Sequence, residues 1–90
     1  MFIYLNGQAI NIDDYDIGKH GQKTWLSFDF KVTHEDYHDV TVLLYDNDFR
    51  VEFPDESLDF QATIYRYYTS FTNLYVEGNV GDFHVELIEV

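Results

Sequence analysis

The sequence predicts an all-β fold, a small antiparallel β-barrel or closed sandwich of about seven to eight short strands joined by hairpins. Apolar and polar residues alternate with a period of two along most of the chain, and no segment keeps a helical period over three turns. Turn-forming residues recur at short intervals between these stretches. At 90 residues the chain is long enough for one domain and too short for two.

The N-terminal segment predicts a β-hairpin. The runs FIYL and QAINI are separated by Asn6-Gly7, the dipeptide that best suits the positive φ angles of a type I′ turn. Residues 13–22, DDYDIGKHGQ, follow with two glycines and scattered charges. This composition predicts a loop.

The stretch TWLSFDFKV alternates strictly and predicts a strand with one core face and one solvated face. Its core side would hold Leu26, Phe28, Phe30 and Val32, and its outer side Ser27, Asp29 and Lys31. The run VTVLLY, residues 40–45, is apolar on both faces, which predicts a central strand. Asp46-Asn47-Asp48 would then turn the chain into a second hairpin with FRVEF.

The C-terminal half predicts two more inner rows of side chains. Pro54 ends its strand because proline cannot donate to a ladder. FQATIYRYY then points Phe60, Ala62 and Ile64 inward, and FHVELIEV does the same with Phe83, Val85 and Leu87. Arg66 breaks the first of these rows, so a bulge at that position is the alternative to regular alternation.

Charge and composition narrow the classes of function. Seventeen acidic residues against five basic ones give a formal net charge of −12, which disfavours nucleic-acid binding because too few cations remain for a basic surface. The chain has no cysteine, so neither disulfides nor thiolate metal sites are expected. No secretory signal and no membrane-spanning run is apparent, and a cytoplasmic protein is expected.

The pentapeptide HEDYH, residues 34–38, matches the signature of a zinc protease. In that signature the two histidines lie on one helix and bind one ion. Between two predicted strands, His34 and His38 would instead be ~13 Å apart, because extended chain rises ~3.3 Å per residue. A small metal-binding protein or hydrolase built on His34 and His38 therefore stays the less favoured alternative. No catalytic residue, metal ligand or cofactor site is assigned.

Tyrosines gather in YRYYTSFTNLY, residues 65–75. Strict alternation places Tyr65 and Tyr67 on the outer face, where Tyr75 could extend an aromatic patch. Tyrosine offers broad contact area at low entropic cost, as binding surfaces require, although it is also simply favoured in strands. We expect a non-enzymatic binding or interaction module that uses Tyr65, Tyr67 and Tyr75 for an unknown protein partner or for self-association.

The segments YHD, VLLY, FRVEFP and TNLYVEG, together with the closing FHVELIEV, resemble the YkvR-like family of small proteins from Bacillus and its relatives. The resemblance covers most of residues 37–90 and is looser before them. It implies an all-β, barrel-like fold and a cytoplasmic bacterial protein. It implies no known activity, and the family pattern does not require His34.

Overall fold

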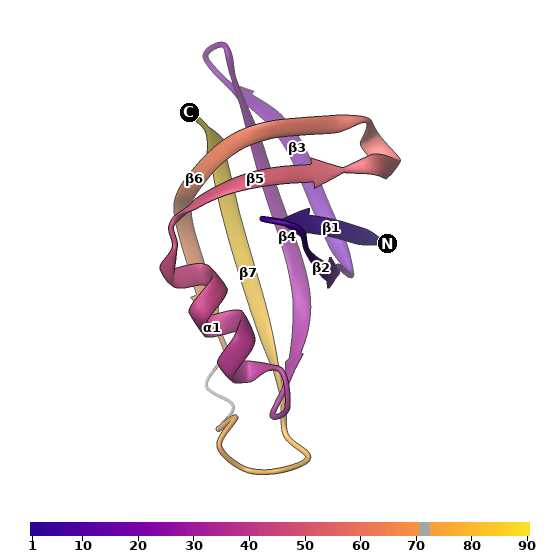
Figure 1. Cartoon of the computed structure of the whole chain (residues 1–90), viewed down its shortest axis with the longest axis vertical. Coiled ribbons are helices and arrows are strands. Elements are labelled where there is room, and N and C mark those ends of the chain that lie inside the picture. Colours follow the sequence, from indigo (N-terminus) through magenta and orange to yellow (C-terminus); the bar gives the residue numbers. More distant parts are fainter. Residues whose placement is uncertain (71–72) are drawn as a thin grey trace.

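The fold is an antiparallel sheet with one α-helix beside it, in a computed structural model that describes residues 1–70 and 73–90 (Figure 1). The elements are β1 (Phe2–Leu5), β2 (Gln8–Asn11), β3 (Asp14–His20), β4 (Lys23–Thr33), α1 (Tyr37–Tyr45), β5 (Asp48–Phe53), the short 3₁₀ helix η1 (Pro54–Glu56), β6 (Leu58–Thr69) and β7 (Val80–Glu89). The seven strands lie in the order β2-β1-β5-β6-β7-β4-β3. The last strand in sequence, β7, thus lies inside the sheet, between β6 and β4.

The sheet is strongly curled, because its two edge strands are joined by only two residues. In a flat sheet the outer strands of seven would lie ~29 Å apart, at ~4.8 Å per strand. The chain from Asn11 to Asp14 can span only ~11 Å. Figure 1 shows the result, in which β5 and β6 cross over the long β4 and β7.

The curled sheet does not close, so the predicted closed barrel or sandwich is wrong, while the all-β antiparallel prediction is confirmed. No ladder joins β2 to β3 within the described residues. The edge strand β3 instead contacts β5 and η1 through its Tyr15 side chain. The Tyr15 ring lies edge-on to Phe53, with centroids 4.9 Å apart, and its hydroxyl donates to the Glu56 carboxylate.

One hydrophobic core fills the concave side of the sheet. The inner rows predicted from alternation are confirmed for β4 and β7. The buried apolar residues are Ile3, Leu5, Ile10, Ile12, Leu26, Phe28, Phe30, Val32, Val40, Leu43, Leu44, Phe49, Val51, Phe53, Ala62, Leu74, Phe83, Val85 and Leu87. Phe60 and Ile64 are partly buried against this cluster.

The first hairpin is also confirmed. Asn6 and Gly7 both have positive φ, 52° and 83°, as a type I′ turn requires. The Asn6 side chain strengthens the turn, since its Oδ1 accepts a hydrogen bond from the backbone N–H of Arg50 on β5. This bond ties the hairpin to the neighbouring strand.

The predicted strand at residues 40–45 is wrong, because these residues form most of α1. Val40, Leu43 and Leu44 are buried, and their spacing of three and four puts them on one helical face. The preceding turn supports the helix start, since the Thr33 hydroxyl accepts from the Asp36 N–H and the Asp36 carbonyl accepts from the Val40 N–H.

Among the described residues, no helix has the length and apolar character needed to cross a membrane.

The predicted loop at residues 13–22 is wrong as well. Its residues form the edge strand β3, which pairs with β4 along its whole length. Gly18 lies inside this strand and faces the Trp25 ring. A Cβ added at Gly18 would lie 3.4 Å from Trp25 Cε3. Most other side chains of β3 are exposed. A strand exposed on both faces has no alternation of apolar and polar residues that would identify it in the sequence.

Candidate functional site

A β-bulge in β6 decides which tyrosines face the concave side of the sheet. The pairing of β6 with β7 shifts between Ile64 and Arg66, so Tyr65 is the extra residue. Under regular alternation Arg66 would continue the inward row and its charge would be buried, at considerable cost. The bulge instead aligns Arg66 with Glu86 and turns Tyr67 inward, opposite the buried Val85.

A pocket of about 520 Å³ lies on this concave side, where α1 faces the end of β6 and the start of β7. Figure 1 shows how these elements converge. The lining residues are Tyr37, Thr41, Leu44, Tyr45, Asn47, Tyr67, Thr69, Ser70, Asn73, Leu74, Tyr75 and Phe83. The helix thus supplies one wall and the sheet the other.

Two contacts hold the segment that begins at residue 73 in place, where it forms a third wall of the pocket. The Nδ1 atom of His34 lies 2.8 Å from the Leu74 carbonyl oxygen. The Leu74 side chain is buried against Gly81 of β7, where an added Cβ would lie 3.2 Å from Leu74 Cδ1. These contacts position Tyr75, whose ring is edge-on to that of Tyr37 at a centroid distance of 5.6 Å.

The chemistry of the lining is aromatic and polar without charge. Tyrosine and phenylalanine rings provide apolar faces, while hydroxyl and amide groups provide hydrogen-bond donors and acceptors. Among the described residues, no carboxylate, imidazole, lysine or arginine lines the pocket. Such a surface can bind and orient a small molecule, but it offers no group that readily transfers a proton near neutral pH.

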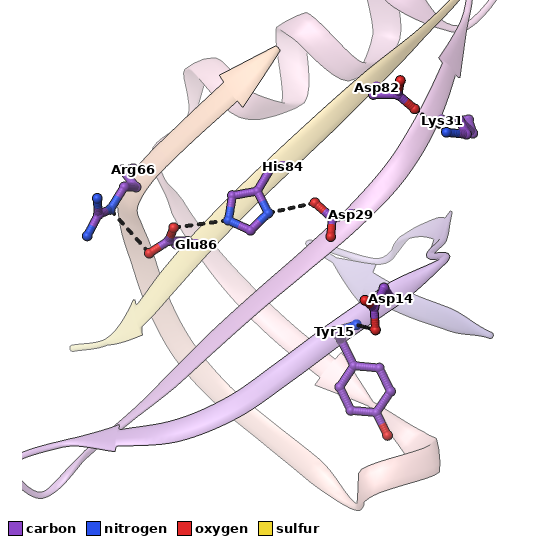
Figure 2. Close-up of polar contacts among 8 residues, drawn as sticks. All are labelled: Asp14, Tyr15, Asp29, Lys31, Arg66, Asp82, His84 and Glu86. Carbon is purple, nitrogen blue, oxygen red and sulfur yellow. Dashed lines mark hydrogen bonds and ion pairs between the residues drawn. The ribbon is translucent and has the colours of Figure 1, made fainter. Parts of the chain in front are cut away.

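The convex side of the sheet carries a charged cluster. Figure 2 shows His84 of β7 between Asp29 of β4 and Glu86, which in turn faces Arg66 of β6. His84 Nδ1 lies 2.6 Å from Asp29 Oδ1, and His84 Nε2 lies 3.0 Å from Glu86 Oε2. Arg66 Nε lies 3.2 Å from Glu86 Oε1. The Tyr68 ring stacks on the imidazole at a centroid distance of 5.8 Å.

The positive and negative charges of this cluster balance one another. Burial lowers the pKa of His84, but hydrogen bonds to Asp29 and Glu86 and the charges of both carboxylates outweigh it, so the pKa is raised above 6.5. A protonated imidazole and one guanidinium then balance two carboxylates. Because both ring nitrogens already face carboxylates, the cluster is better suited to holding three strands together than to catalysis.

The HEDYH residues do not converge on a metal site. His38 lies in the first turn of α1, while His34 precedes the helix and faces the Leu74 carbonyl. The prediction that HEDYH lies between two strands is therefore wrong, since a strand precedes it and a helix follows. In the described part of the chain, no group of three or more His, Cys, Asp or Glu side chains could hold a metal ion.

The three tyrosines predicted as one outer patch are divided between two sides of the molecule. Tyr67 and Tyr75 line the pocket. Tyr65 instead lies 5.8 Å from the His20 ring, centroid to centroid, and beneath the Arg66 guanidinium. Two residues of the predicted stretch, 71 and 72, lie outside the described residues.

Sequence reasoning missed Tyr37 and Tyr45, the tyrosines that α1 contributes. A signal for them existed. Tyr37, Thr41 and Leu44, which all line the pocket, are spaced by four and three residues, as neighbours on one helical face are. A helix over residues 37–45 would have placed Tyr37, Thr41 and Leu44 on one face.

The family comparison agrees with the resemblance seen in the sequence. A model of the family described as protein of unknown function DUF3219 matches residues 2–90. The chain belongs to this family. A Bacillus subtilis (strain 168) relative, named uncharacterized protein YkvR, is 44% identical over 68 residues, which make up 76% of this chain and 71% of the relative.

A member of the family also supports the fold. The NMR solution structure of YkvR from Bacillus subtilis is similar to this structure with a TM-score of 0.62 and 34% sequence identity. The match covers 98% of this chain and 83% of that one. The predicted YkvR-like resemblance is thus confirmed, and it extends over the N-terminal part that the sequence motifs left loose.

Proposed function

We propose that this protein is a non-enzymatic binding module that holds a small organic ligand in the tyrosine-lined pocket. The pocket itself carries the proposal. Its volume, about 520 Å³, falls within the ~300–1,000 Å³ typical of small-molecule sites. Aromatic walls with a few polar groups are the usual lining of such sites.

The exposure of the tyrosines supports binding rather than a purely structural role. Tyr67 is 52% exposed and Tyr75 is 80% exposed, although both belong to a concave surface that a ligand could cover. Large aromatic side chains left in water on one concave surface are typical of interaction sites. The uncharged lining favours binding over acid–base catalysis at this position.

Binding can be tested with a library of small neutral and charged organic fragments, followed through the backbone amide NMR spectra of the whole chain. We expect some fragments to shift the signals of α1, the end of β6 and residues 73–75 together. The Tyr67→Ser variant should weaken the binding of these fragments. A library that gives no shifts at the pocket, or shifts mainly on the convex face, would contradict the proposal.

Tyr65 provides a matched control for that experiment. It belongs to the same strand as Tyr67 and is similarly exposed, at 46%, but it does not line the pocket. Tyr65→Ser should therefore leave fragment binding unchanged. Equal losses in both variants would show that the effect does not come from the pocket.

Self-association through the convex face is a second candidate. It is favoured by the exposure of Tyr68, 55%, beside Tyr65 on the other side of β6 from the pocket. Sedimentation of the wild type and of Tyr65→Ser tests it. A dimer that Tyr65→Ser weakens supports this candidate, whereas a monomer at every concentration removes it.

A further inference from the structure

The charges around the tyrosine-lined pocket are strongly one-sided. All five lysine and arginine side chains lie outside its lining, and four of them contact polar partners elsewhere. Lys31 pairs with Asp82, Arg50 with Asp59, Arg66 with Glu86, and Lys19 donates to the Thr24 hydroxyl. Lys23 lies at the far end of the β3–β4 hairpin. No lysine or arginine in the described chain therefore offers an anionic ligand a direct ion pair in the pocket.

Acidic residues, in contrast, flank the lining in sequence. Asp36 precedes Tyr37, Asp46 follows Tyr45, and Glu77 lies two residues after Tyr75. All three side chains are exposed. The net charge of −12 gives the surface of the molecule as a whole a negative potential, which raises the local concentration of cations and lowers that of anions.

The lining selects among cations by their hydration. A primary ammonium group is strongly hydrated and needs carboxylate or carbonyl partners when it leaves water. No carboxylate lines the described pocket. A quaternary ammonium group has no N–H to satisfy, and it is attracted to the electron-rich faces of aromatic rings. Aromatic lining with no charged partner favours the second kind of cation.

The ring geometry suits that cation. The Tyr37 and Tyr75 rings are nearly perpendicular, with an interplanar angle of 85°, so they form a corner rather than a flat stack. Tyr45 and Tyr67 add rings from α1 and β6 to the same lining. Tyrosines contributed from several directions around one pocket are the arrangement by which proteins bind quaternary ammonium groups.

We propose that the pocket takes a small organic cation with a quaternary ammonium group, held against the tyrosine rings by cation–π attraction. This inference rests on the proposed binding function and specifies its ligand class. Attraction comes from the acidic surroundings at long range and from the rings at short range. A neutral ligand of the same shape is attracted neither by the acidic charge nor by the ring faces, and an anion is repelled by the acidic charge.

Choline chloride is a suitable probe, and its carbon analogue, in which a tert-butyl group replaces the trimethylammonium group, is a neutral control of almost identical shape. Both are titrated at constant ionic strength into the whole chain while amide spectra are recorded. We expect choline to bind more tightly and to shift the pocket residues. Loss of a single ring face should weaken choline binding roughly 2- to 5-fold, so Tyr67→Leu should show this loss and Tyr67→Phe should not.

Tyr65→Leu separates the pocket from general attraction to an acidic surface, and it should leave choline affinity unchanged. Equal weakening in Tyr65→Leu and Tyr67→Leu would overturn the inference. Equal affinity for choline and its carbon analogue would also overturn it, while leaving a binding pocket in place. Absence of choline binding would overturn it too, and the fragment library would then decide separately whether the pocket binds anything.

Discussion

His84 and Asp29 face each other across the pairing of β7 with β4, with Nδ1 and Oδ1 2.6 Å apart. Because Glu86 occupies the other ring nitrogen, the protonated imidazole has an acceptor on each side. Arg66 completes the cluster from β6, so three strands of the sheet are joined on the convex face by one chain of charged contacts.

This cluster predicts a stability that decreases as the pH rises above about 6.5. The pKa of His84 is raised in the folded protein, so between the unfolded and folded pKa values the folded state binds the extra proton. Its contribution is complete below the unfolded pKa and is lost as pH passes through the folded pKa. Thermal melting between pH 6 and pH 9 should show the decrease.

His84→Gln isolates the contribution of the imidazole, because Asp29, Glu86, Arg66 and Tyr68 remain in place around it. The variant should be less stable than the wild type at pH 6, and the difference should narrow at higher pH. A constant difference across the range would show that protonation of His84 does not contribute to folding.

A structural role of His34 predicts a loss of stability without any metal. His34→Ala removes the partner of the Leu74 carbonyl and should lower the free energy of unfolding by about 1 kcal/mol. His38→Ala should have a smaller effect, since His38 is exposed in the first turn of α1. Urea unfolding of both variants measures the difference.

Zinc provides the complementary measurement. Because His34 and His38 do not converge on one site, stoichiometric zinc should leave the melting temperature of the wild type unchanged. A rise of several degrees that disappears in both His34→Ala and His38→Ala would support the metal-binding alternative instead.

Gly81 is predicted to be sensitive to the addition of a single methyl group. Its φ is not positive, so an alanine would meet no backbone strain. Its Cβ would nevertheless lie 3.2 Å from Leu74 Cδ1 and 3.3 Å from Ser70 Oγ. Crowding of this kind costs roughly 1–3 kcal/mol, and Gly81→Ala should destabilise the protein by about the lower value.

A double-mutant cycle with Leu74→Ala tests the cause. Shortening Leu74 removes the contacts of the added Cβ with Leu74 Cδ1 and Cδ2 and leaves the one with Ser70 Oγ, so Gly81→Ala should cost less in that background. Unchanged additivity of the two substitutions would show that the crowding lies elsewhere. The Leu74→Ala variant also reports on the pocket, because Leu74 is part of its lining.

The net charge of −12 predicts a dependence on salt. Like charges on so small a surface repel one another in the compact state, and salt screens this repulsion within a Debye length of ~10 Å at 0.1 M. The melting temperature should therefore rise between low and physiological sodium chloride. A fall would mean that pairs such as Arg50 with Asp59 outweigh the repulsion.

Sequence reasoning succeeded where one face of a strand meets the core and the other meets water. The inner row Leu26, Phe28, Phe30 and Val32 is buried as this contrast predicts, although Ser27 of the predicted solvated row is buried as well. The Asn6-Gly7 turn follows from the positive φ angles that a type I′ turn requires. It failed at residues 40–45, where a short apolar run rich in valine and leucine fits a buried strand and a buried helical face equally well.

Neither the edge strand nor the shape of the sheet could be obtained from local patterns. β3 has one neighbouring strand and mostly exposed side chains, so its residues carry the composition of a loop. Closure depends on whether β2 and β3 pair, which no local pattern specifies. The pocket was missed because one wall is α1, which was taken for a strand, and because the bulge at Tyr65 turns Tyr67 inward. Only the pairing of β6 with β7 decides between this bulge and regular alternation.

The place of β7 within the sheet also governs the order in which the chain can fold during synthesis. Until residues 80–89 are made, β4 has only β3 beside it and β6 has only β5. Before β7 pairs, the other strands can form only two separate half-sheets, each with an unpaired inner edge. Because pairings of long sequence separation form slowly, we expect the pairing of β7 with β4 to be a late step of folding, and the concave surface with its pocket is complete only after this step.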